Sequence, residues 1–162
     1  MASPVNIEAR IFVDRPPEVV FDTVAYPFAG PQWELRAGHR LVTEGGLRVG
    51  ARAEVTAEDD MTLVEEVIEL ERPSVLATRN LSGPVDIVAR WTVEPSEGGT
   101  RLTRLTTMGR SKARLMRIVL PFTMRRIERE GYEKLRRQNQ ALLHRLKAAL
   151  ESEAGPAGPG YP

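Results

Sequence analysis

Residues 7–24 read IEARIFVDRPPEVVFDTV, and this stretch decides the fold because a strand pattern passes directly into a helix pattern. Every second residue from Ile7 to Val13 is apolar, which predicts a strand with one buried face. Asp14 and the two prolines that follow predict the start of a helix capped by Asp14, because the first turn of a helix tolerates proline. The apolar side chains of Val20 and Phe21 would form the buried stripe of that helix.

A second helix is predicted at the other end of the chain, from Lys112 to Leu150. Apolar residues recur there at steps of three and four, which is typical of an amphipathic helix. Pro121 interrupts the pattern, so we expect a kink or break near Leu120. Gly131 would either let the backbone approach the sheet or leave room for a ligand.

The sequence between these helices predicts an antiparallel sheet. Turn residues separate short runs with strand character, and with the first strand they give about seven strands. Residues 26–33 predict an irregular turn or a short second helix, with Trp33 and Leu35 facing inward. One long helix over a curved sheet tends to leave a hollow that suits an apolar ligand. The six runs with strand character between the two predicted helices are Arg40–Glu44, Ala51–Ala57, Met61–Glu71, Val75–Leu81, Val85–Glu94 and Thr100–Met108.

Length and composition limit the kind of protein. The 162 residues suit one domain, expected over residues 1–153, followed by a disordered tail over residues 154–162. The chain has no cysteine, which excludes disulfides and thiolate metal sites, and its two histidines lack metal-ligand spacing. We therefore expect no metal and no cofactor. Neither a secretory leader nor an apolar run of about 18 residues is present, so the expected location is the cytoplasm, without integral membrane association.

Four segments in order resemble the START-like, or SRPBCC, superfamily of polyketide cyclase/dehydrase and lipid-transport proteins, which have the fold of the birch-pollen allergen. The resemblance covers nearly the whole predicted domain. It implies an α+β helix-grip fold: a seven-stranded curved antiparallel sheet wrapped around a long C-terminal helix, with two short helices after strand one. The segments are Asp14–Phe21 (DRPPEVVF), Gln32–Trp33, the hairpin Arg90–Thr103 and the closing helix Leu146–Glu151.

The candidate site residues are those that would face the hollow. If Leu102 faces the long helix, strict alternation places Arg104 and Met108 on the same face, while Arg90 and Trp91 must face opposite ways. The strand arginines would orient an acceptor group of the ligand, or else face water and pair with Glu54, Glu65 or Asp86. Candidate ligand-binding residues are Trp33, Leu35, Arg79, Arg104, Met108, Ile118, Phe122, Tyr132 and Leu135. Candidate catalytic residues are Arg104, Arg90, Tyr132 and His39.

Three functions fit this pattern. The first is a carrier or self-resistance protein that binds a hydrophobic small molecule, such as a polyketide-like or aromatic natural product. The second is a polyketide aromatase/cyclase that promotes aldol closure and dehydration. The third is a protein that docks on a membrane surface or an acidic partner, because residues 110–147 contain twelve Lys or Arg against three Glu. Nucleic acid is not an expected partner, because the basic residues lack interleaved aromatic side chains. The sequence leaves the oligomeric state open.

Overall fold

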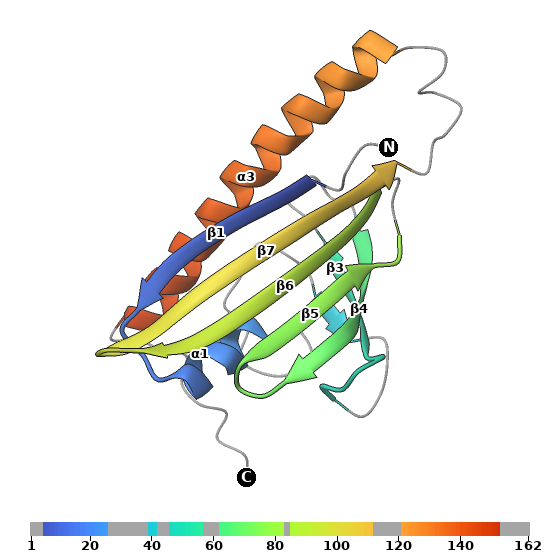
Figure 1. The fold of residues 1–162 in the computed structure, drawn as a ribbon. Coiled ribbons are helices and arrows are strands. Elements are labelled where there is room, and N and C mark those ends of the chain that lie inside the picture. The colour runs from blue at the N-terminus through green and yellow to red at the C-terminus, as the bar shows by residue number, and fades with distance from the viewer. Residues whose placement is uncertain are drawn as a thin grey trace.

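The computed structural model describes residues 5–25, 39–41, 46–56, 62–82, 85–111 and 121–152 (Figure 1). The predicted second short helix, the region of the predicted break near Leu120 and the predicted tail lie outside these ranges. In chain order the elements are β1 (Val5–Val13), α1 (Pro17–Val24), β2 (His39–Leu41), β3 (Arg52–Thr56), β4 (Thr62–Glu71), β5 (Val75–Asn80), β6 (Val85–Ser96), β7 (Gly99–Ser111) and α3 (Pro121–Glu151).

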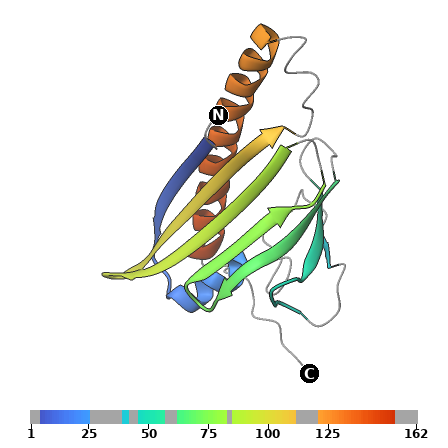
Figure 2. The same ribbon diagram turned by 45° about the vertical axis from the view of Figure 1, so that its right-hand side comes forward.

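The described strands form one antiparallel sheet in the order β1-β7-β6-β5-β4-β3-β2. The first strand therefore pairs with the last, and Ile11 lies opposite Leu102. The two helices within the described ranges, α1 and α3, lie on the same side of the sheet (Figures 1 and 2). The predicted α+β class, with an antiparallel sheet and a long C-terminal helix, is confirmed.

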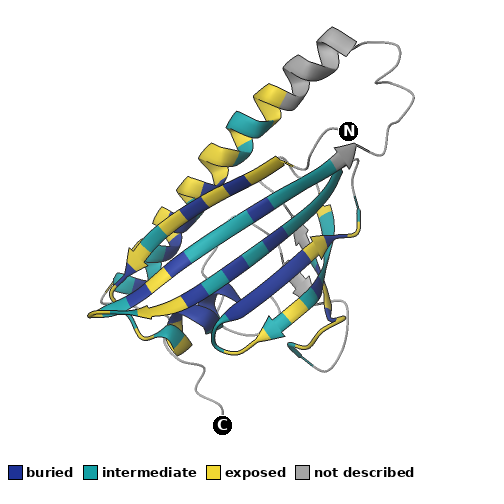
Figure 3. Cartoon of the chain, viewed as in Figure 1, coloured by how far each residue is buried: buried dark blue, intermediate teal, exposed yellow. Residues whose placement is uncertain are grey.

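We call the sheet face toward α1 and α3 the inner face, and the opposite one the outer face. The alternating bands of burial along β1, β7 and β6 distinguish the two faces (Figure 3). Large apolar side chains fill the space between the inner face and the C-terminal half of α3, and each buried leucine there stabilises the fold by about 1.5–3 kcal/mol. Buried members of the core cluster include Val13, Val20, Phe21, Val67, Leu76, Leu102, Leu143, Leu146 and Leu150.

The start of α1 differs from the prediction. The N-cap residue is Pro16, Pro17 occupies the first helical position, and no side chain caps the helix. Asp14 lies too far before the helix to serve as its cap. The fixed backbone angle of proline suits the first helical position and its missing N–H is not needed there, so the helix begins without a capping side chain.

Contacts at the end of α3 hold it against the loop between β1 and α1. The backbone N–H of Asp14 donates to Glu151 Oε1 at 2.8 Å. Lys147 Nζ donates to the carbonyl oxygen of Phe12 at 2.8 Å and also to Glu151 Oε1. These four residues form what we call the terminal clasp, because they join the first strand to the last helix.

The two halves of α3 differ in burial. Between residues 129 and 138 most side chains are exposed, whereas Asn139, Leu143, Leu146 and Leu150 are buried at helical spacing. The N-terminal end of α3 extends past the sheet in both ribbon views (Figures 1 and 2). A Cβ built on Gly131 would meet no atom within 4 Å, so the predicted close approach of Gly131 to the sheet is wrong.

Candidate functional site

Small side chains occupy the middle of the inner face. The strand pairing places Ala89 between Thr106 of β7 and Thr78 of β5, and Thr78 lies opposite Val67 of β4. These side chains extend less far from the sheet than leucine or phenylalanine would. The centre of the inner face is therefore built differently from its β1 side, where large residues pack against α3.

Arg104 borders this strip. Leu102 and Thr106, two positions before and after it on β7, are both 0% exposed, which confirms the predicted alternation. The guanidinium carbon of Arg104 lies 4.8 Å from the centre of the Trp91 ring, its cross-strand neighbour on β6. The Nε atom of Arg104 is buried. A guanidinium stacked on an aromatic ring keeps its N–H groups directed at an acceptor in a fixed plane.

Arg79 and Arg90 lie on the outer face, so neither contributes to the inner face. Arg90 donates to both carboxylate oxygens of Glu69, at 3.0 and 2.8 Å. Hydrogen bonding from Arg90 lowers the pKa of Glu69. Arg79 forms an ion pair with Asp86 at 3.9 Å, one of the partners expected for a water-facing arginine. The predicted roles of Arg79 in binding and of Arg90 in catalysis therefore have no geometric support.

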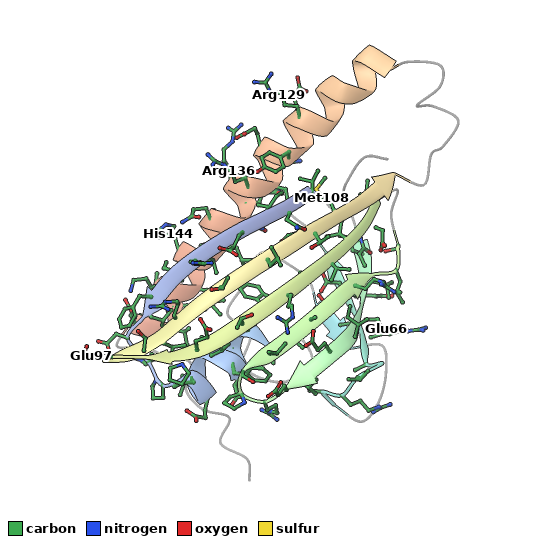
Figure 4. The ribbon with its side chains drawn as sticks, viewed as in Figure 1. Glu66, Glu97, Met108, Arg129, Arg136 and His144 are labelled. Atoms are coloured by element: carbon green, nitrogen blue, oxygen red, sulfur yellow. The ribbon has the colours of Figure 1, made fainter. Side chains whose placement is uncertain are left out.

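The remaining predicted site residues do not cluster around Arg104. Met108 is half-buried on the inner face, near the start of β1 (Figure 4), where its cross-strand partner is Val5. Tyr132 and Leu135 are half-buried on α3, seven and four positions before Asn139, and thus on the same helical stripe. Trp33, Leu35 and Ile118, together with the side chains of Phe122 and His39, lie outside the described residues.

Several polar residues of the inner face were not predicted from the sequence, and Glu65 is the most unusual of them. Glu65 lies opposite Ala53 of β3 and Asn80 of β5, which are 0% and 8% exposed, so its side chain shares their face. Its neighbour Glu66 pairs with Arg52 on the outer face at 2.6 Å. The predicted pairing of Glu65 with a water-facing arginine is therefore wrong.

A buried hydrogen bond sets the position of α3 over the sheet. Asn139 Nδ2 donates to Thr106 Oγ1 at 2.9 Å, and the two residues are 1% and 0% exposed. A buried amide requires such an acceptor, so this pair fixes which turn of α3 faces the centre of β7.

The exposed N-terminal part of α3 carries a shallow hollow whose lining differs from the inner face of the sheet. Its lining consists of Arg129, Glu130, Glu133 and Arg137. Since every lining side chain is charged, the hollow does not suit a hydrophobic ligand. Neither α1 nor α3 combines the length and the hydropathy that a membrane-spanning helix requires.

A family model described as polyketide cyclase / dehydrase and lipid transport matches residues 4–151. The comparison with curated proteins gave no match.

Many solved structures share the fold. One is Ara h 8.0201, with a TM-score of 0.66, 12% identity, and coverage of 90% of this chain and 97% of that chain. TTHA0849 from Thermus thermophilus has a TM-score of 0.65 and 16% identity, with 91% and 100% covered. DynU16, from the dynemicin biosynthetic locus, has a TM-score of 0.63 and 19% identity, with 91% of this chain and 47% of that chain covered. At these identities the likeness concerns the fold alone.

Proposed function

Because this chain belongs to the polyketide cyclase/dehydrase and lipid transport family, the family that its sequence resembles, we propose that it binds a hydrophobic small molecule between the inner face and α3. The ligand class is a polyketide-like or aromatic natural product, and the role is that of a carrier or of a self-resistance protein that sequesters its ligand. The observation that carries the proposal is the strip of small side chains bordered by Arg104 stacked on Trp91.

Each part of this arrangement supports binding of an apolar molecule with one polar group. Apolar surface removed from water contributes about 25 cal/mol per Å². Ala89 and Thr78 are buried, at 6% exposed each, and their small side chains would give a planar molecule a flat apolar surface to pack against. Arg104 supplies a fixed cation that would orient a carbonyl, phenolate or carboxylate of the ligand. Met108, Tyr132 and Leu135 would contact the ligand from β7 and α3.

Binding of an aromatic carboxylate would test the proposal. We expect naphthoate to bind the protein, and the Arg104→Gln variant to bind it about tenfold more weakly, because a hydrogen bond to a charged group is lost. Arg101→Gln is the matched control, since Arg101 is an exposed residue three positions earlier on the same strand. Calorimetric titration gives the three affinities. Equal weakening in both variants, or no binding of naphthoate and related polycyclic compounds to the wild type, would contradict the proposal.

The position of Arg104 also favours a second function, that of an aromatase/cyclase. Arginine does not exchange protons near neutral pH, so its part would be to stabilise the enolate oxygen that develops during aldol closure. Mass spectrometry of each ligand after incubation separates the two functions. An unchanged ligand mass supports a binder, and loss of water from a poly-keto compound supports a cyclase.

A further inference from the structure

We propose that the inner face holds a second polar contact, at Glu65, and that the ligand is elongated and mainly apolar with polar groups at both ends. One end would carry an acceptor for Arg104, and the other a hydroxyl or amine that donates to the Glu65 carboxylate. This inference rests on the proposed function and adds the shape and the polarity of the ligand.

The strand register establishes the direction of Glu65. It lies in the middle of β4, with Ala53 and Asn80 beside it on the neighbouring strands, and Val67 on the same face is 0% exposed. Glu65 itself is half-buried. Among the residues that the structure describes, none forms an ion pair with it.

The neighbours of Glu65 determine what it would bind. Ala53 has no polar side-chain atom. Ser82 orients the Asn80 amide by donating its backbone N–H and Oγ to Asn80 Oδ1 at 3.0 and 3.3 Å, so neither neighbour brings a positive charge to Glu65. A carboxylate that is half-buried, and that a bound ligand would cover further, gains from donors or a positive charge. A ligand amine or hydroxyl at the centre of β4 would supply them.

The distance from Glu65 to Arg104 sets the length of the ligand. The register places Glu65 in line with Met108 of β7, four residues along the strand from Arg104 and therefore about 13 Å away in that direction. The three strand spacings between β7 and β4 add about 14 Å across the sheet. Thr78 and Ala89 lie between the two charged residues, so a rod-shaped apolar molecule would cross small side chains.

Opposite charges at the two ends would also fix the orientation of the ligand. A carboxylate or phenolate placed near Glu65 would meet a like charge, whereas the same group near Arg104 gains a charge-assisted hydrogen bond. The structure therefore favours one of the two directions in which an elongated ligand could lie.

Two fatty acids that differ in one group test the inference: dodecanoate, and ω-aminododecanoate with an amine at the far end. Both are titrated against protein loaded with the fluorescent probe anilinonaphthalene sulfonate. In the Glu65→Gln variant we expect the affinity for ω-aminododecanoate to fall about tenfold and that for dodecanoate to stay unchanged, because only the amine contacts Glu65. Glu66→Gln is the matched control, one residue along on the outer face, and should bind both probes as the wild type does.

A second variant, Glu65→Leu, is included because the glutamine amide in Glu65→Gln can still accept a hydrogen bond from the ligand amine, whereas leucine cannot. It should bind dodecanoate at least as tightly as the wild type does, while ω-aminododecanoate loses affinity. Circular dichroism confirms that each variant is folded. If dodecanoate binds and both Glu65 variants treat the two probes alike, the second contact is refuted and the proposed function stands. If neither fatty acid displaces the fluorescent probe from the wild type, the inner face does not hold an elongated ligand with polar ends and this inference is refuted, while naphthoate binding still decides the proposed function.

Discussion

The hydroxyl of Thr106 is enclosed between β7 and α3, and it accepts the amide N–H of Asn139. We expect Thr106→Val to lower the free energy of unfolding by about 1–3 kcal/mol, because the buried Asn139 amide loses its acceptor. Adding Asn139→Leu should restore much of that loss, since an apolar pair leaves no buried polar group unpaired. Urea denaturation of the two single variants and the double variant measures this coupling. Additive losses would show that the hydrogen bond does not join the two positions.

Glu151 gives the terminal clasp a predictable dependence on pH. The backbone N–H of Asp14, and then Lys147, lower the pKa of Glu151 in the folded protein. The pKa of a glutamate in the unfolded chain is about 4.3. Because the pKa of Glu151 is lower in the folded protein, its charge stabilises the fold at pH values above the unfolded pKa. This contribution disappears as the pH falls through the folded pKa. We therefore expect Glu151→Gln to reduce the melting temperature most near pH 7 and progressively less as the pH falls below the unfolded pKa of about 4.3.

Melting curves measured at a series of pH values from 7 down into this acidic range check the prediction. Glu97→Gln, in the exposed turn between β6 and β7, is the control and should leave the melting temperature unchanged across the range. A Glu151→Gln defect of the same size at every pH would mean that the charge of Glu151 does not contribute.

The sequence predicted some residues of the inner face and not others, for a physical reason. On β7 one regular alternation passes through Leu102 and Arg104, so fixing the face of the leucine fixed that of the arginine. Residues 62–71 carry apolar side chains in both alternating sets, and a bulge between Val67 and Glu69 shifts their register. The inward position of Glu65 therefore depends on its partners in β3 and β5, which the sequence of β4 alone does not specify.

At the scale of elements, Gly131 is an avoidable weakness in α3. Glycine in an exposed helix interior costs about 1 kcal/mol relative to alanine, and a new Cβ would meet nothing within 4 Å. We expect Gly131→Ala to raise the melting temperature. Gly109→Ala is the contrasting variant, because its Cβ would lie 3.2 Å from Asp86 Cβ, and it should give no gain. Thermal denaturation of both variants distinguishes these outcomes, and a loss of stability in Gly131→Ala would indicate a contact at that position.

The element boundaries show where sequence patterns are sufficient. Turn residues separated the strands well: the predicted runs Val75–Leu81 and Val85–Glu94 correspond closely to β5 and β6. The start of α1 was misplaced because Asp14 suits a cap in isolation. In the folded protein its backbone N–H is bound by Glu151, which lies 137 residues away in the sequence. Such a long-range partner leaves no local pattern.

At the scale of the whole molecule, the uneven burial of α3 predicts uneven stability. Amide hydrogens between residues 129 and 138 should exchange faster than those between residues 139 and 151, because exposed helix with few apolar contacts opens at lower free energy. A ligand that contacts Tyr132 and Leu135 should reduce this difference. Hydrogen exchange followed by mass spectrometry, with and without dodecanoate, checks both statements. Equal protection along α3 in the free protein would contradict the first, and unchanged exchange in the presence of bound ligand would contradict the second.

The pairing of β1 with β7 also affects how the protein can be synthesised. A chain leaves the ribosome with its N-terminus first, so β1 is synthesised long before β7, which contains the Leu102 that lies opposite Ile11. Until then the nascent chain exposes β1 as an apolar strand with unpaired backbone groups, and the inner face stays uncovered until α3 follows. Folding by such distant contacts is intrinsically slow. We therefore expect the nascent chain to expose apolar strand surface for longer than a chain whose strands pair with sequence neighbours.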